Sequence, residues 1–128
     1  MFQVAYERQF AKLFDMEVAK ILRLFVCQGL WRYTGLQAPG RVLVQALGEK
    51  DEDTRTIAGM FLVKAGKQAE PLLEEALREE QNLPTVLTIL GDIGDKRIEA
   101  KLRQYTLHQD PVVAQAACDA LQALTLDK

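Results

Sequence analysis

The stretch Leu90-Gly-Asp-Ile-Gly-Asp-Lys-Arg-Ile98 contains the helix boundary that decides the fold of this chain. An apolar run with helical spacing ends at Gly94, a residue type that readily adopts the positive φ found where helices end, and a second helical run follows. Glycines close similar runs at Gly66, 28 residues earlier, and at Gly35, another 31 residues earlier. Self-similarity at this period predicts a solenoid built from helix-loop-helix units.

Apolar periodicity and helix start signals extend this pattern along the chain. Asp110-Pro111 is typical of a helix start, because a capping carboxylate precedes a proline whose φ already suits a helix. No stretch alternates apolar and polar residues over the length of a strand. The sequence therefore predicts an all-α fold of seven or eight helices, with residues 1–15 as a separate N-terminal helix and residues 16–128 as the repeat domain. We expect helices over residues 2–14, 16–34, 41–47, 53–65, 71–77, 82–93, 97–107 and 111–126.

The composition is that of an ordinary folded domain. The 128 residues are 48% hydrophobic and 27% charged, with a net charge of −2. Residues 1–40 carry a net charge of +2 and residues 41–128 carry −4, without the clustered Lys and Arg that a phosphate-binding surface needs, so we expect no nucleic-acid partner. The longest uncharged stretch, residues 81–91, is too short to span a bilayer, and the N-terminus lacks a secretory signal pattern. We expect a cytoplasmic protein in which Cys27 and Cys118 are reduced core thiols.

Several segments match a known repeat pattern. The stretch Leu90–Asp95, followed by Arg97-Ile98 and by Asp110-Pro-Val-Val-Ala114, resembles the HEAT-like repeats, in particular the short bacterial form found in phycobilin lyases. Asp53-Thr-Arg55, Ala69–Leu77 and Asp110–Leu121 each match a part of the same pattern. The resemblance extends from about Leu47 to Leu124, is weaker from Met16 to Leu47 and is absent from the first fourteen residues.

This resemblance implies a right-handed α-α superhelix whose second helices line a concave face that binds other proteins. We therefore expect a non-enzymatic adaptor or scaffold with a protein partner. The alternatives are an accessory or chaperone-like subunit of a lyase or other enzyme complex, and a membrane-peripheral adaptor. Alignment of the three second helices predicts which side chains face the partner. They are Arg41, Gln45, Glu74, Glu75, Arg78, Lys101, Arg103 and Gln104.

Residues that could support catalysis have simpler explanations. His108 is the only histidine, and we expect a solvated or capping role in a turn. Carboxylates adjacent in sequence, such as Glu74-Glu75, point in different directions into water. Gly91 and Gly94 close a helix and are followed by Asp95, whereas a phosphate loop opens one. We expect no enzymatic activity, cofactor or metal.

Aromatic residues are concentrated near the N-terminus, where seven of the nine lie within the first 33 positions. Phe2, Tyr6, Phe10 and Phe14 are spaced by four residues, so they lie along one stripe of a helix. Three interpretations remain open: a cap on the first repeat, a contact with a partner protein or a second copy, and a membrane-surface helix. The last is disfavoured by the acidic residues of the segment. A homodimer through the final helix is a further option.

Overall fold

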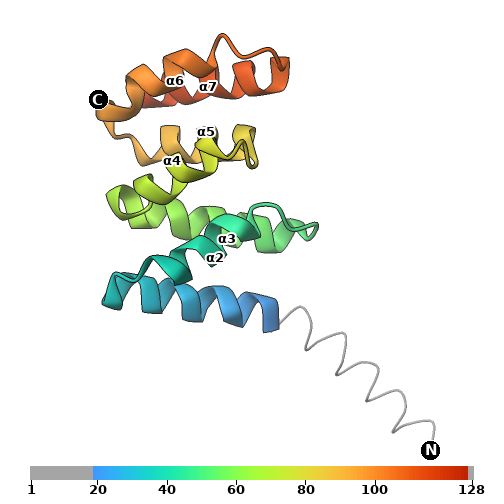
Figure 1. The fold of residues 1–128 in the computed structure, drawn as a ribbon, viewed down its shortest axis with the longest axis vertical. Helices are drawn as coiled ribbons and strands as arrows, with labels where there is room; N and C mark the ends of the chain where they lie inside the picture. Colours follow the sequence, from blue (N-terminus) through green and yellow to red (C-terminus); the bar gives the residue numbers. More distant parts are fainter. Residues whose placement is uncertain (1–18, 127–128) are drawn as a thin grey trace, which may run out of the picture.

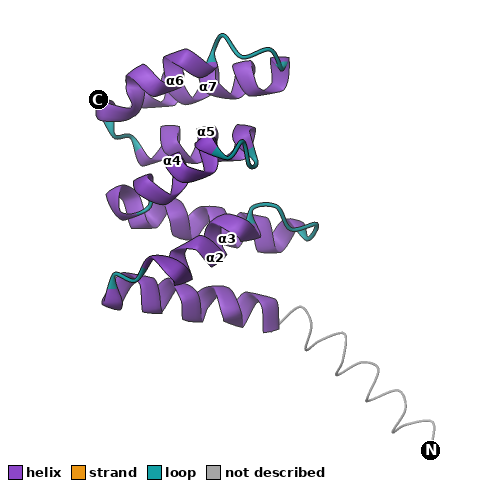
Figure 2. Ribbon diagram, viewed as in Figure 1, coloured by secondary structure: helices purple, strands orange, loops and turns teal. Residues whose placement is uncertain are grey.

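The computed structural model describes residues 19–126, and within that range the chain forms α-helices and no strand (Figures 1 and 2). This confirms the predicted all-α fold. The predicted helix over residues 2–14 lies outside the described residues. In chain order the structure contains a helix over residues 19–34, α2 (Gln37–Ala46), α3 (Glu52–Ala65), α4 (Glu70–Arg78), α5 (Leu83–Ile93), α6 (Glu99–Tyr105) and α7 (Pro111–Leu126), with the 3₁₀ turns η1 (Gly66–Gln68) before α4 and η2 (Lys96–Ile98) before α6.

The helices stack in two rows. We call the helix over residues 19–34 together with α3, α5 and α7 the odd row, and α2, α4 and α6 the even row. Within the rows α3 packs on α5, α5 on α7 and α2 on α4. Each even-row helix also packs on the odd-row helix that follows it in the chain. Figure 1 shows the resulting stack, which has the helix over residues 19–34 at one end and α6 and α7 at the other.

The three glycines identified in the sequence end the first helix of each repeat in the same way. Gly35, Gly66 and Gly94 have φ values of +72°, +60° and +77°. Each donates its backbone N–H to the carbonyl of the residue four positions earlier, which satisfies an otherwise free acceptor at the helix end. The residue that supplies this carbonyl is large and buried in every case. These residues are Trp31, Leu62 and Leu90.

Acidic side chains and prolines define several helix starts. Asp51 accepts the N–H of Asp53 at 3.3 Å before α3, and Asp110 accepts the N–H of Val112 at 3.0 Å before α7. The predicted start of α2 at Arg41 is wrong, because α2 begins at Gln37. Pro39 lies in its first turn, where a helix does not need the missing N–H.

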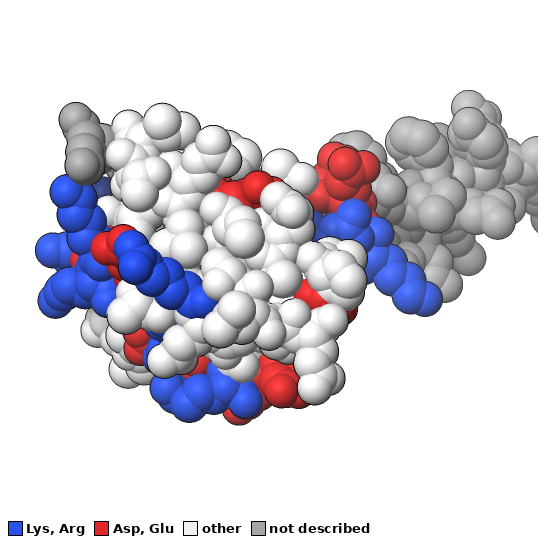
Figure 3. Space-filling model, turned by 90° about the horizontal axis from the view of Figure 1, so that it is seen from above, with Lys and Arg blue, Asp and Glu red and all other residues white. Residues whose placement is uncertain are grey.

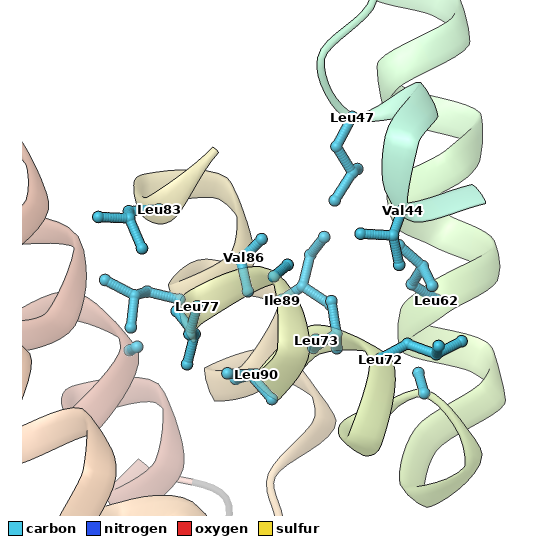
Figure 4. Close-up of a cluster of buried hydrophobic side chains, with 14 of the residues drawn as sticks. Val44, Leu47, Leu62, Leu72, Leu73, Leu77, Leu83, Val86, Ile89 and Leu90 are labelled. Atoms are coloured by element: carbon cyan, nitrogen blue, oxygen red, sulfur yellow. The ribbon is translucent and has the colours of Figure 1, made fainter. Parts of the chain in front are cut away.

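The core is one continuous cluster between the rows. Figure 4 shows Leu72, Leu73 and Leu77 of α4 facing side chains of the neighbouring helices. Small residues set the closest helix approaches. A Cβ on Gly91 would lie 2.7 Å from Cα and Cβ of Ala120, so this glycine allows α5 and α7 to touch. Likewise, a Cβ on Gly40 would lie 2.7 Å from the Trp31 ring.

The structure shows which apolar residues of the first described helix are buried, and it corrects the expected burial of the cysteines. In the helix over residues 19–34 the buried side chains are Leu24 and Trp31, whereas the apolar residues Leu22 and Val26 are exposed. Both cysteines are free, as predicted, but Cys118 is exposed and Cys27 is half-buried. Neither thiol belongs to the core, because the inward positions of their helices are taken by other residues.

Candidate protein-binding face of the even row

A chain of charged side chains crosses the three even-row helices. Arg41 Nε of α2 lies 3.5 Å from Glu75 Oε2 of α4, and Lys101 Nζ of α6 lies 3.8 Å from Glu74 Oε1 of α4. All four side chains are at least one-third exposed. Exposed pairs of this kind stabilise a fold by about 0–1 kcal/mol, so they mainly orient the side chains and leave them available to a partner.

A groove of about 180 Å³ lies between α2 and α4 on this face. Its three apolar lining residues, Val44, Leu72 and Ala76, are buried, whereas its rim is charged and polar. The groove can therefore accept a small side chain while the rim pairs with polar groups beside it. The polar lining residues are Arg41, Gln45, Glu75, Glu79 and Gln81.

The structure brings together most of the residues predicted to face a partner, but not all. Arg78 is exposed on α4, four positions after Glu74 and hence on the same side of the helix. Arg103 lies two positions after Lys101, which places it about 200° further around α6. It pairs instead with Glu99, one turn earlier, at 2.7 Å. Gln104 is exposed on α6.

A carboxyl pair that the sequence interpretation missed lies at the start of α4. Asp95 accepts the backbone N–H of Arg97 at 3.0 Å and its guanidinium at 3.0–3.3 Å, and these hydrogen bonds lower the pKa of Asp95. Burial and the neighbouring Asp95 raise the pKa of Glu70. Because 25 sequence positions separate the two carboxyl groups, no local spacing indicates that they meet. Their interaction brings the start of α4 next to the turn before η2. Asp95 also caps η2, because its side chain accepts the backbone N–H of Arg97.

The odd row carries a larger and more apolar hollow that the sequence interpretation also missed. It has a volume of about 510 Å³ and lies between α3 and α5. Met60 is 64% exposed there, and Gly59 leaves room beside it. Which side of α3 faces outward depends on how the rows pack, so the spacing of its apolar residues did not indicate this surface. The lining residues are Gly59, Met60, Val63, Lys64, Ile89 and Asp92.

His108, the only histidine of the sequence, lies in the turn before α7. His108 Nδ1 accepts the N–H of Asp110 at 3.0 Å, and its ring stacks on Tyr105 with centroids 6.3 Å apart. This arrangement orders the turn before α7, as predicted for a capping residue. Among residues 19–126, no three His, Cys, Asp or Glu side chains converge as a metal site. None of the described helices has the length and apolar character needed to cross a membrane.

The C-terminal end of the stack presents a largely uncharged surface. Figure 3 looks onto this end and shows Lys, Arg, Asp and Glu mainly around its edge. Leu107, Val112 and Leu126 are exposed in this part of the chain. The final helix, through which the sequence analysis considers a homodimer, lies at this end of the stack.

No protein-family model matches the chain, and no curated protein or solved structure gives a significant match.

Proposed function

We propose that this chain is a non-enzymatic adaptor of the HEAT-like type that binds a polar segment of a partner protein across its even-row face. The observation that supports this function is the groove between α2 and α4, which has a buried apolar lining and a rim of both charge signs. The charged series continues through Glu74 to Lys101 of α6, so a partner segment can follow successive repeats. Mixed signs favour a partner with alternating charges, because complementary pairs give specificity along the segment.

We place this adaptor in the cytoplasm of a bacterial cell. The short form of the repeat that the sequence resembles is bacterial. Cys27 and Cys118 are free thiols, which suits a reducing compartment.

A second function within the same class is a chaperone-like accessory subunit that holds a substrate protein. The apolar hollow between α3 and α5, with Met60 exposed, favours it. Flexible methionine side chains adapt to varied apolar surfaces. The two functions use opposite rows and can therefore be separated by substitution.

Exchanging one ion pair tests the even-row face. In the double variant Arg41→Glu, Glu75→Arg, the two side chains can still pair with each other, but a partner meets reversed charges. We expect the helical circular dichroism and the melting temperature to stay unchanged, while proteins enriched from the native host by the wild-type chain are lost. One enriched protein is then purified, and its affinity for both chains is measured directly; we expect the variant to bind at least about tenfold more weakly.

Met60→Glu is the matched control on the odd row. It charges the hollow between α3 and α5 and leaves the even row intact. Binding that survives the exchange of Arg41 and Glu75 but is lost with Met60→Glu contradicts the even-row proposal and supports the chaperone-like function.

A further inference from the structure

Helix α4 divides its charged side chains between its two even-row neighbours. Glu75 pairs with Arg41 of α2, and Glu74 pairs with Lys101 of α6. Neighbouring positions on a helix point about 100° apart, so the two glutamates lie on different flanks of α4. Residues one turn later keep these directions, because positions four apart lie on the same side of a helix. α4 therefore presents one flank to α2 and another flank to α6.

The flank toward α2 continues to Glu79, whose carboxylate has no matching cation on α2. Glu79 donates its backbone N–H to the carbonyl of Glu75 at 3.0 Å and so lies one helical turn after it. Gln45, one turn after Arg41, lines the same groove and carries no charge. Among the residues that the structure describes, Glu79 takes part in no ion pair. The groove therefore has an ion pair at one position and an unpaired carboxylate one turn later.

The flank toward α6 has the opposite surplus. Arg78 lies one turn after Glu74 and is exposed. The residue one turn after Lys101 on α6 is the uncharged Tyr105, which donates its hydroxyl to the carbonyl of Leu77 at 3.5 Å and thus lies beside the end of α4. Within the described part of the chain, Arg78 forms no ion pair. This flank therefore offers an unpaired guanidinium to a partner.

We propose that the partner segment is bipolar, with a basic residue beside an aliphatic anchor in the groove between α2 and α4, and an acidic residue over Arg78 on the α6 side. This inference rests on the even-row function proposed above and adds the order of charges along the partner. The anchor follows from the buried apolar lining of the groove, formed by Val44, Leu72 and Ala76. The two charges follow from the unpaired Glu79 and Arg78, because complementary charges across an interface determine which partner fits.

The width of α4 sets the spacing between the two charges of the partner. Glu79 and Arg78 lie on the two flanks of this helix, and neighbouring helices pack about 8–10 Å apart. An extended chain rises about 3.3 Å per residue, so about three residues separate the basic position from the acidic one. The segment thus crosses the even row in an extended conformation, with its basic end toward α2 and its acidic end toward α6.

Peptide selection on the full-length chain tests this charge order. The probe is a phage-displayed library of random peptides, selected in parallel on the wild type and on Glu79→Lys. We expect the wild type to enrich peptides in which Lys or Arg adjoins an aliphatic residue and Asp or Glu lies about three positions away. Glu79→Lys should instead enrich Asp or Glu beside the aliphatic residue, because this part of the rim has changed sign.

Direct binding measures the contribution of each charge. One enriched peptide is synthesised, and its affinity is measured by fluorescence polarisation. We expect Glu79→Lys and Arg78→Glu each to weaken binding about fivefold to tenfold, because an attraction becomes a repulsion at an exposed site. A second peptide has its basic and acidic residues exchanged. It should bind the double variant Arg78→Glu, Glu79→Lys more tightly than it binds the wild type, a gain that misfolding cannot produce.

Glu80→Lys is the matched control. Glu80 is exposed and adjoins Glu79 in the chain, but it does not line the groove. The substitution changes the net charge by the same amount as Glu79→Lys, so we expect the affinity for the selected peptide to stay within about twofold of the wild-type value. Circular dichroism spectra and melting temperatures of all variants check that the fold is retained.

Three results overturn the proposal. Peptides that are lost with the exchange of Arg41 and Glu75, but bind equally well after reversal of Glu79 or Arg78, would retain the even-row function and refute the bipolar partner. A selection in which no enriched peptide depends on the even row would contradict the proposed function as well. Equal weakening by Glu80→Lys would show a general effect of net charge and would remove the specific role of Glu79.

Discussion

Glycines act in this protein through two different physical properties. Gly35, Gly66 and Gly94 adopt a positive φ. Residues that have a Cβ adopt such a φ only at a cost in free energy. Gly91 instead supplies space, because α5 and α7 approach each other at its Cα. The first property can be recognised from the sequence, since such glycines follow apolar helical runs. The second cannot, because Ala120 lies 29 positions away and meets Gly91 only in the folded chain.

Gly91→Ala tests the role of space at the contact between α5 and α7. The new Cβ would lie 2.7 Å from Ala120 Cα and 2.8 Å from its carbonyl oxygen, both backbone atoms that cannot move alone. We expect unfolding in urea to show a loss of about 1–3 kcal/mol. Gly59→Ala is the control, because its Cβ would lie 3.8 Å from Cδ1 of Ile89, an ordinary contact distance, and alanine favours a helix. An equal loss in both variants would refute the packing argument.

Glu70 gives a pH dependence whose sign follows from its environment. Burial and Asp95 raise its pKa above the ordinary 4.5, so the folded state holds this proton more tightly than the unfolded state. The stability that it contributes is present below 4.5 and is lost as the pH rises through the raised pKa. Glu70→Gln is neutral at every pH. Its melting temperature relative to the wild type should therefore increase as the pH rises above 4.5, as measured by thermal melts in a series of buffers.

Asp95 makes the opposite contribution. Its lowered pKa stabilises the fold above the ordinary value of 3.8, and this stability is lost as the pH falls through the folded value. If the difference in melting temperature between the wild type and Glu70→Gln does not change with pH, the pKa of Glu70 is not raised in the folded state.

At the scale of single elements, helix boundaries depend on local chemistry, and the sequence therefore predicted most of them closely. α3, α4, α5 and α7 begin within one residue of their predicted starts, at or next to an acidic residue, asparagine or proline. α6 begins two residues after its predicted start at position 97, behind the 3₁₀ turn η2, and α2 begins four residues before its predicted start at Arg41. A proline usually marks a helix start, but Pro39 lies two positions inside α2, since any position of the first turn tolerates it.

Asp51→Ala tests the capping of α3. The Asp51 carboxylate accepts the N–H of Asp53 at 3.3 Å and the hydroxyl of Thr54 at 2.7 Å, and Thr54 is buried. Loss of the carboxylate removes the cap and leaves the buried hydroxyl without this acceptor. We expect a cost of about 1–2 kcal/mol in chemical denaturation. Asp53→Ala, which changes an exposed residue of the same turn, should cost about 0.5 kcal/mol. A larger loss for Asp53→Ala would contradict the assignment of Asp51 as the cap.

At the scale of the whole molecule, the repeats create surfaces that belong to no single helix. The even-row groove combines Arg41 and Gln45 of α2 with Glu75 of α4, and the odd-row hollow combines Met60 of α3 with Ile89 of α5. Alignment of the repeats predicted the first combination, because corresponding helices of neighbouring units lie side by side. The same alignment predicted that Arg103 and Lys101 face the partner together. Positions two apart on a helix point to different sides, and Arg103 pairs with Glu99 instead.

The sequence by itself determined that this chain is all-helical, where its helices end and that its units repeat, because periodicity, glycine conformation and capping act over a few residues. The tertiary structure decided which of two apolar stripes on the helix over residues 19–34 is buried, which glycine carries a helix contact and that Glu70 meets Asp95. These outcomes depend on atoms supplied by distant segments, and local preference is the same for either stripe. Packing alone distinguishes them.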